Sequence, residues 1–431
     1  MKRLRTKTRP LRGDVTIPGD KSISHRALII GALAAGGSRV RRPNFGADVH
    51  STAEVLRRLG VRVELDEMKG QAKVEGVGGA AFREPEAVLD AGNSGTTMRL
   101  MAGACAGADG LFVLTGDDSL RRRPMLRVVA PLRQMGARID GRNHGDLAPL
   151  TVRGGALTGV DVELPVASAQ VKSALLLAGL NAAGVTRVSE PRRSRDHTER
   201  MLASAGIHVE SEGRAASVRG GQRPHGLEGL VPGDISSAMF LIAAAALVPG
   251  SDLNLLDVGL NPTRRAALDV LRMMGAEVDA IESASSLGEP LGTVRARAAS
   301  LRGIAVPEEW VPSLIDDIPA LAIVATQAEG ETSFTGAGEL RVKESDRIAA
   351  LVAGLRELGA DAEELPDGLI VRGPTSLTGG HIDSVGDHRI ALAFAVAGLI
   401  ASDRVRIAGW SCVDTSFPEF LDVLGEATDR R

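Results

Sequence analysis

The chain has 431 residues, of which 44% are hydrophobic, with 51 Lys and Arg against 54 Asp and Glu. This balance excludes a broadly basic nucleic-acid-binding protein, and only two cysteines argue against a disulfide framework or a Cys-based metal site. No run approaches the ~18 uninterrupted apolar residues of a membrane span. The basic residues 1–10 precede no apolar segment, so we expect a solvated N-terminal arm on a cytoplasmic protein.

One pattern recurs six times along the chain, at intervals of about 70 residues: a β-type run, a polar cluster, a long apolar helix, Gly and another strand. The polar clusters lie at 18–26, 91–99, 166–172, 232–237, 315–319 and 386–389. The helices that follow have almost no charged face, which predicts that they are buried. Such helices are expected over 27–35, 173–180, 239–248, 320–325 and 391–400.

A second, amphipathic helix completes each repeat, and a strand usually follows it. These helices are expected at 51–59, 125–135, 197–205, 263–274, 345–358 and 417–424, with strands at 61–64, 137–140, 207–210 and 276–279. The segment 281–300, rich in Ser, Ala and Gly, is interpreted as a surface connection. Six repeats exceed what one core usually holds, so the pattern predicts an α/β protein of two domains with three repeats each.

Cations at the predicted helix starts point to anion binding. Lys21 and Arg26 lie in the cluster at 18–26, where a positive side chain opposes the helix dipole unless an anion is shared with the free N–H groups. The same conflict recurs at 93–99, where Gly95 would let a ligand approach the backbone, and at 387–389. By contrast, Asp234 is expected to be an ordinary helix N-cap.

Two carboxylates stand out because their sequence neighbours are mostly cationic: Asp316 and Glu344 suit acid–base roles. The pair Asp316 and Asp317 could also suggest a metal, but helix capping is commoner and no third ligand is in view. Neither a zinc-type His spacing nor a phosphate loop or dinucleotide fingerprint is present, so no metal or organic cofactor is expected. Cys105 is expected in the core.

These motifs resemble the enolpyruvyl transferase family, and within it the 5-enolpyruvylshikimate-3-phosphate synthases (3-phosphoshikimate 1-carboxyvinyltransferases). The matching pieces span nearly the whole chain in family order. They are Asp-Lys-Ser-Ile-Ser-His-Arg at 20–26, Gly-Asn-Ser-Gly-Thr at 92–96, Arg-Pro at 123–124, Ser-Ala-Gln at 168–170, Arg-Val-Lys-Glu-Ser-Asp-Arg at 341–347 and Asp-His-Arg at 387–389.

The resemblance implies two similar domains, each a threefold repeat of a βαβαββ unit with buried central helices, and an active site in the interdomain cleft. It places 18–232 in one domain and 233–431 together with 1–17 in the other. The implied reaction joins phosphoenolpyruvate to the 5-hydroxyl of shikimate 3-phosphate through a tetrahedral ketal and releases phosphate. It belongs to chorismate and aromatic amino-acid biosynthesis and is the target of glyphosate. The implied partners are these small molecules, with no nucleic acid or membrane, and the implied state is a monomer.

Roles implied by the resemblance are carried over by matching position. Asp316 would accept the 5-hydroxyl proton and Glu344 would handle the methylene proton, with Lys21 and His388 nearby. The implied shikimate 3-phosphate ligands are Lys21, Ser22, Arg26, Ser168, Ala169, Gln170, Arg195, Asp316 and Lys343. The implied phosphoenolpyruvate ligands are Lys21, Gly95, Arg123, Gln170, Arg347 and Arg389. Glu339 and the residues before Phe417-Pro418 depart from some members, so no contact is carried over there.

Two alternatives remain at this point. The sister enzyme acting on UDP-N-acetylglucosamine carries a Cys in the loop matching 115–124 and lacks the element at 20–26, whereas this loop has no Cys. A catalytically silent anion-binding relative is the other alternative, since fold does not determine function. The carboxylates Asp316 and Glu344 argue against it, because a pure binder of anions gains nothing from them.

Overall fold

The computed structural model describes residues 2–3, 9–78 and 82–429, and the chain divides into two compact units. Unit 1 comprises Met1–Pro18, Gly233–Ala284 and Pro290–Arg431, and unit 2 comprises Gly19–Pro232 and Ser285–Glu289. Both units mix helices and sheets, so the predicted α/β class is confirmed. Within the described part of the chain, no helix is both long and apolar enough to cross a membrane.

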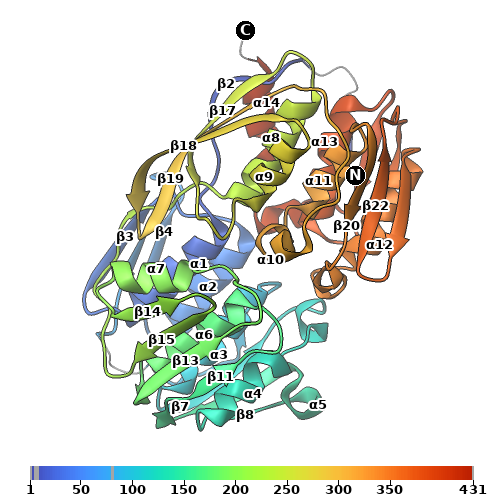
Figure 1. Cartoon of the computed structure of the whole chain (residues 1–431). Helices are drawn as coiled ribbons and strands as arrows, with labels where there is room; N and C mark the ends of the chain where they lie inside the picture. Colours follow the sequence, from blue (N-terminus) through green and yellow to red (C-terminus); the bar gives the residue numbers. More distant parts are fainter. Residues whose placement is uncertain (1, 4–8, 79–81, 430–431) are drawn as a thin grey trace. The chain divides into compact units, whose positions relative to one another are not determined.

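Three buried helices form the centre of unit 2, and α3 and α6 pack side by side (Figure 1). Each begins with a side-chain cap, from Asp20, Ser94 and Ser168 respectively. Three amphipathic helices accompany them. The buried helices are α1 (Lys21–Leu33), α3 (Gly95–Ala106) and α6 (Ala169–Gly179), and the amphipathic ones are α2 (Ala47–Arg58), α4 (Leu126–Gln134) and α7 (His197–Ser204).

The sheets of unit 2 repeat one topology three times: β16-β3-β5-β4, β6-β7-β9-β8 and β11-β13-β15-β14. In each sheet the first pair is parallel and the others are antiparallel, as a strand–helix–strand–helix–hairpin unit requires. The strands are β3 (Gly37–Arg41), β4 (Arg62–Asp66), β5 (Gln71–Glu75), β6 (Leu89–Asp90), β7 (Gly110–Thr115), β8 (Arg138–Gly141), β9 (Leu147–Gly154), β11 (Asp161–Glu163), β13 (Val185–Ser189), β14 (Val209–Glu212), β15 (Ala215–Arg219) and β16 (Glu228–Leu230). A short parallel pair, β10 (Leu157–Thr158) with β12 (Ala182–Ala183), and the turns η1 (Leu120–Arg122) and α5 (Arg142–Gly145) complete the unit.

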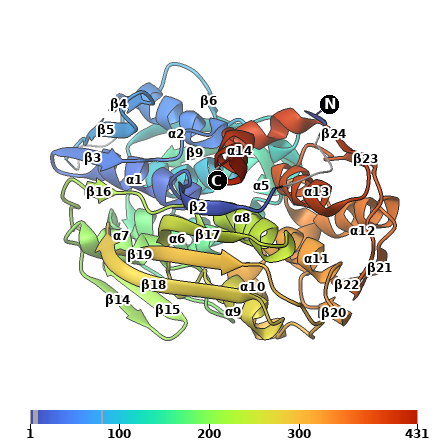
Figure 2. The ribbon, with the colours of Figure 1, turned by 90° about the horizontal axis from the view of Figure 1, so that it is seen from above.

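Unit 1 is built in the same way around three buried helices, and its sheet β18-β19-β17-β2 has the same strand order (Figure 2). Its other sheets are β20-β22-β21 and β1-β24-β23. The buried helices are α8 (Ile235–Leu247), α11 (Ile318–Ala325) and α13 (His388–Ile400), and the others are α9 (Ala266–Met273), α10 (Val311–Leu314), α12 (Arg347–Glu357) and α14 (Phe420–Asp429). The strands are β1 (Lys2–Arg3), β2 (Arg12–Thr16), β17 (Asp252–Gly259), β18 (Glu277–Ser286), β19 (Glu289–Arg297), β20 (Gly330–Phe334), β21 (Asp361–Leu365), β22 (Gly368–Gly373), β23 (Gly380–Asp383) and β24 (Val405–Ala408), with the turns η2 (Glu308–Trp310), η3 (Gly338–Val342) and η4 (Trp410–Thr415).

The cores confirm that the apolar helices are buried. Each unit has its own hydrophobic cluster, made largely of these helices and the inward side chains of the strands. Cys105 lies within the core of unit 2, as predicted. Asp234 accepts a hydrogen bond from Ser236 N at 2.9 Å, which confirms it as the N-cap of α8.

The buried helices begin earlier than the sequence pattern predicted. For example, α1 begins at Lys21 instead of residue 27, and α13 begins at His388 instead of residue 391. Each polar cluster therefore spans a helix start and also supplies its first turn: residues 18–20 precede α1, and residues 21–26 lie within it. Hydrophobic periodicity cannot detect such a turn, because its side chains are polar although its backbone is helical.

The interpretation of 281–300 as a surface connection is wrong. This segment forms most of the hairpin β18–β19, the long pair of strands in Figure 2. Most of β18 is exposed, so the backbone ladder holds it and no apolar alternation marks it. Residues 285–289 group with unit 2, where Ser286 Oγ accepts a hydrogen bond from Leu230 N at 2.8 Å. The predicted N-terminal arm lies mostly outside the described residues, but Lys2 and Arg3 pair with β24.

Close helix packing generates a stability prediction at Gly103. A Cβ added there would lie 2.2 Å from Ala174 O on α6, so α3 and α6 would have to separate. We expect Gly103→Ala to lower the free energy of unfolding by about 1–3 kcal/mol, the usual cost of overpacking. Urea denaturation measures this. The matched control is Gly155→Ala, where an added Cβ meets nothing within 4 Å; equal effects at both sites would contradict the packing argument.

Candidate active site

The first turn of α1 carries a cation held by an ion pair. Lys21 Nζ lies 2.9 Å from Asp48 Oδ2, and Asp48 is in the first turn of α2. Ser22, the next residue of α1, contributes its backbone carbonyl to Arg26. Helix N-termini favour negative charge, so Asp48 compensates Lys21 where its charge opposes the helix dipole. Lys21 is thereby anchored at the end of α1 that attracts anions.

Arg26 joins three helices through neutral oxygens. Its Nε donates to Thr198 Oγ1 at 2.7 Å, Nη1 to Ser22 O at 2.9 Å and Nη2 to Ser173 Oγ at 2.8 Å. Burial lowers its pKa to about 10, although Glu199 and Asp20 oppose that shift. The guanidinium stays charged near neutral pH, and none of these three hydrogen bonds goes to an anion. It is therefore a source of positive potential within unit 2.

Two further guanidiniums converge on the start of α3. A Cβ added at Gly95 would lie 2.8 Å from Arg99 Nη1 and 3.4 Å from Arg123 Nη1. Arg99 donates to Gln170 Oε1 at 2.7 Å, and Arg123 donates to Asn93 Oδ1 at 2.7 Å. The bare Cα of Gly95 leaves room for both cations, and the approach of a ligand to its backbone stays a prediction.

The start of α6 lies beside these cations. Ser168 caps the helix, Ala169 is its first residue, and the Gln170 amide donates to Thr96 Oγ1 at 2.9 Å. Gln170 thus bridges Arg99 and the first turn of α3. Arg195 precedes α7, and its charge is near enough to Arg26 to lower the pKa of that residue.

The acid–base candidates in unit 1 share one guanidinium. Arg347, the first residue of α12, donates to Asp316 Oδ1 at 3.1 Å, to Asp387 Oδ2 at 2.7 Å and to Glu344 Oε2. Burial alone would lower the pKa of Arg347, but Asp387, Glu344 and Asp316 together raise it. Two carboxylates distant in sequence, Asp316 and Glu344, are therefore brought to one charged group.

Two more predicted residues contact Asp316, and a third, His388, follows Asp387 in the chain. Lys343 Nζ lies 3.6 Å from Asp316 Oδ1, and Arg389 Nη1 donates to the Asp316 carbonyl at 2.7 Å. Asp387 caps α13 by accepting from Arg389 N at 2.9 Å, and His388 is the buried first residue of that helix. Over the described ranges, no cluster of His, Cys, Asp and Glu is arranged to hold a metal ion.

Asp317 is a buried carboxyl that the sequence interpretation treated as a helix cap. It occupies the N-cap position of α11, but its side chain makes no capping hydrogen bond. Neither of its oxygens has a hydrogen-bond partner among the described residues, and Arg389 Nη1 lies 3.9 Å from Oδ1. Burial raises the pKa of Asp317 to about 6, against the opposing charges of Arg264 and Arg389. Capping is therefore not its role.

The structure groups the predicted residues by unit. Unit 2 holds Lys21, Ser22, Arg26, Gly95, Arg123, Ser168, Ala169, Gln170 and Arg195, and unit 1 holds Asp316, Lys343, Glu344, Arg347, His388 and Arg389. Three participants were given no role, namely Asp48, Arg99 and Asp387, and Asp317 was interpreted only as a helix cap. Arg99 and Asp387 lie inside the polar clusters, so a signal existed for them. Asp48 lies in an ordinary amphipathic helix, where nothing in the sequence marks it.

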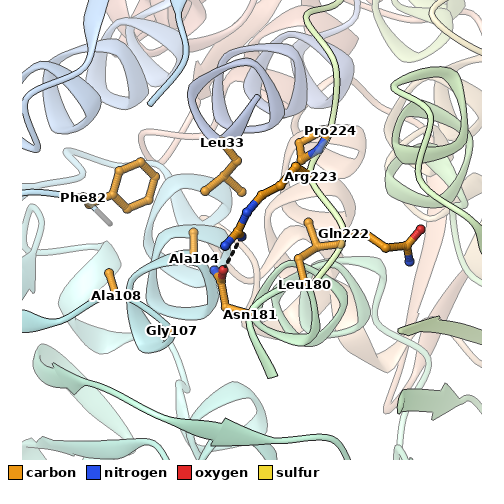
Figure 3. Close-up of a pocket in the computed structure, with 10 residues that line it drawn as sticks. All are labelled: Leu33, Phe82, Ala104, Gly107, Ala108, Leu180, Asn181, Gln222, Arg223 and Pro224. Atoms are coloured by element: carbon orange, nitrogen blue, oxygen red, sulfur yellow. Dashed lines mark hydrogen bonds between the residues drawn. The ribbon is translucent and has the colours of Figure 1, made fainter. Parts of the chain in front are cut away.

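A pocket at the other end of the buried helices contains none of the predicted site residues (Figure 3). It has a volume of about 260 Å³ and lies at the C-terminal ends of α1, α3 and α6. Arg223 extends into it and donates to Asn181 Oδ1 at 2.8 Å. A cation at helix C-termini is stabilised by the helix dipoles, so Arg223 has a structural explanation here.

Comparisons with known proteins identify the family. A sequence model described as "EPSP synthase (3-phosphoshikimate 1-carboxyvinyltransferase)" matches residues 5–424. A 3-phosphoshikimate 1-carboxyvinyltransferase of Halorhodospira halophila is 53% identical over 96% of this chain and 93% of its own length. One of Pelotomaculum thermopropionicum is 52% identical over 97% of both. The chain belongs to the EPSP synthase family.

Solved structures agree with the sequence comparisons. EPSP synthase from Acinetobacter baumannii superposes with a TM-score of 0.89 at 42% identity, covering 99% of this chain and 98% of that one. The enolpyruvyl transferase NikO from Streptomyces tendae matches with a TM-score of 0.78 at 18% identity, covering 99% and 96%, which shows the shared fold alone. The family match does not favour the alternative enzyme acting on UDP-N-acetylglucosamine.

The buried carboxyl of Asp317 generates a pH-dependent prediction. Its folded-state pKa lies above the ordinary 3.8. The native state therefore holds this proton more tightly, and stability contributed by Asp317 falls as pH rises between about 4 and 6. We expect the unfolding free energy of Asp317→Asn, relative to the wild type, to increase by roughly 1.4 kcal/mol from pH 5 to pH 8.

Denaturant titrations at the two pH values measure this difference. Asp361→Asn removes an exposed carboxylate of the same unit and serves as the control. A stability difference between Asp317→Asn and wild type that stays constant with pH would contradict the raised pKa.

Proposed function

We propose that this chain is a 3-phosphoshikimate 1-carboxyvinyltransferase, which transfers the enolpyruvyl group of phosphoenolpyruvate to the 5-hydroxyl of shikimate 3-phosphate. The products are 5-enolpyruvylshikimate 3-phosphate and phosphate. Family membership over nearly the whole chain supports this activity. The observation that carries the mechanism is that Asp316 and Glu344 share the guanidinium of Arg347, because addition–elimination needs two proton-transfer groups held together.

In the addition step, the 5-hydroxyl oxygen bonds to C2 of phosphoenolpyruvate while C3 gains a proton, giving a tetrahedral ketal. Asp316 accepts the hydroxyl proton. Its contacts with Arg347 and Lys343 favour the ionised carboxylate, the form that can accept. Glu344 handles the proton at C3, with Lys21 and His388 as assisting groups.

In the elimination step, the methyl group at C3 loses a proton, the C2–C3 double bond reforms, and the bond from C2 to the phosphate oxygen breaks. The leaving phosphate carries away the negative charge. Cations placed where this charge develops stabilise the transition state. Lys21, Arg123 and Arg389 are the proposed groups for this purpose.

Ligand binding is proposed to draw on both units. Shikimate 3-phosphate is held by Lys21, Ser22, Arg26, Ser168, Ala169, Gln170, Arg195, Asp316 and Lys343, and phosphoenolpyruvate by Lys21, Gly95, Arg123, Gln170, Arg347 and Arg389. The two ligands bring two phosphates and two carboxylates. The neutral partners of Arg26 leave its charge available for an anion, whereas Arg347 can bind one only by sharing or exchanging a carboxylate. We also propose that the protein acts as a monomer in the cytoplasm, which its two free cysteines suit.

The direct test is phosphate release from the purified full chain supplied with phosphoenolpyruvate and shikimate 3-phosphate. Release that requires both substrates is expected. Replacing shikimate 3-phosphate with UDP-N-acetylglucosamine is the discriminating control, and release with that acceptor instead would refute the proposal. Binding of both substrates without release would favour a silent anion-binding relative.

Asp316→Asn tests the proposed proton acceptor. Turnover should fall by about 10²-fold or more, because a general acid–base group typically supplies 10²–10⁴. Binding of shikimate 3-phosphate should stay within roughly tenfold, since the amide keeps an oxygen for Arg347. Steady-state kinetics and calorimetry measure the two quantities, with Asp361→Asn as control. Turnover near the wild-type value would refute this role and make Asp317 the next candidate.

A further inference from the structure

A buried chain of hydrogen bonds links the starts of α1 and α3 through the middle of α2. His25 Nδ1 lies 2.6 Å from Thr52 Oγ1, and Thr52 Oγ1 lies 2.6 Å from Thr97 Oγ1. Thr97 Oγ1 then donates to Ser94 Oγ at 2.7 Å. All four side chains are fully buried. This series of hydrogen bonds ends at Ser94, the N-cap of α3, one residue before Gly95.

The direction of each hydrogen bond in this series follows from the two hydrogen bonds that Ser94 accepts. Ser94 Oγ accepts from both Thr97 N and Thr97 Oγ1, so the Thr97 hydroxyl proton is committed to Ser94. Thr97 must then accept from Thr52, because a hydroxyl has one proton to donate. Thr52 in turn must accept from His25. The imidazole therefore carries its proton on Nδ1.

The surroundings of His25 keep that imidazole neutral. Burial, Lys21 and Arg26 hold its pKa well below its usual value, and Asp20 opposes them weakly. Nε2 is buried and has no hydrogen-bond partner among the described residues. Leaving a ring nitrogen unpartnered costs free energy, and an apolar side chain would avoid this cost. We therefore expect the hydrogen bond donated by Nδ1–H to have a role that offsets this cost.

We propose that His25 is a positioning residue that orients the first turn of α3 through Thr52 and Thr97. Held in this way, Gly95 and Arg99 keep the geometry in which the phosphate of phosphoenolpyruvate is bound; this step rests on the function proposed above. Arg99 lies four residues after Gly95, so both are on the same face of α3. A rotation of the first turn would move the backbone N–H groups and the cation together. His25 itself touches no substrate in this proposal.

Substitution of Thr52 tests the hydrogen-bond series at the residue that links His25 to Thr97. Thr52→Val keeps the shape but cannot pass on the hydrogen bond. We expect the KM for phosphoenolpyruvate to rise about tenfold, equivalent to ~1.4 kcal/mol. The kcat and the KM for shikimate 3-phosphate should change less than about threefold. Thr52→Ser restores the hydroxyl and should restore the KM.

The matched control is Thr186→Val, a buried threonine on β13 whose hydroxyl has no partner among the described residues. It should leave all three kinetic constants unchanged. An unchanged KM for phosphoenolpyruvate in Thr52→Val, or a rise that Thr52→Ser does not reverse, would overturn the proposal.

The tautomer of His25 gives a readout that does not depend on catalysis. In protein labelled with ¹⁵N-histidine, the two-bond couplings between the ring protons and nitrogens identify the protonated nitrogen. His25→Asn assigns the resonance among the eight histidines. We expect the proton on Nδ1 between pH 6 and 8. A proton on Nε2 would overturn the directed chain, whereas absence of phosphate release in the wild type would refute the function and leave the tautomer result standing.

Discussion

The organisation of this protein depends on six helices that have no polar side. Such a helix must be surrounded by other elements along its length, so only its two ends can meet water or a ligand. In unit 2 the backbone contact at Gly103 keeps α3 and α6 together, and their starts bring Gly95 and Gln170 to the same place. Several of the predicted site residues therefore lie in the first turns of these helices, among them Lys21, Gly95 and Gln170. The N-terminal ends of helices attract anions, and the proposed substrates are anions.

The buried guanidiniums of Arg26 in unit 2 and Arg347 in unit 1 have different hydrogen-bond partners. In unit 2, Arg26 donates its hydrogen bonds to hydroxyl and carbonyl oxygens, and Glu199 and Asp20 act on its charge without accepting any of these bonds. In unit 1, Arg347 is surrounded by three carboxylates. This difference matches the two tasks proposed above, in which unit 2 holds anions through its cations and unit 1 supplies the proton-transferring carboxylates Asp316 and Glu344. Asp317, also in unit 1, is a further carboxyl of this kind, because burial raises its pKa to about 6, close to neutral pH.

Much of the fold could be predicted from the sequence because its signals are strong and repeated. Long apolar helices with polar starts can be recognised without a structure, and Asp234 shows that even a cap can be predicted. The failures have local physical causes. The strand β18 is held by its backbone ladder while its side chains are mostly exposed, so composition suggests a loop. The charge groups around Arg347 arise from residues far apart in sequence, which no local pattern can bring together. The neutral state of His25 depends on burial and on two neighbouring cations, and neither can be deduced from its position in a motif.

The position of β2 has a consequence for how the chain is made. β2 pairs in parallel with β17, and beside it Leu11 N donates to Ser251 Oγ, a contact spanning 240 residues. On the ribosome, β2 emerges before its partner β17 exists. At about 5–20 residues per second, it waits roughly 12–50 s, while all of Gly19–Pro232 is synthesised and can begin to fold. The strand Arg-Gly-Asp-Val-Thr has charged or small residues at three of its five positions. Charged residues on an unpaired strand oppose its pairing with other chains. The composition of β2 therefore lowers its tendency to aggregate until β17 has been synthesised.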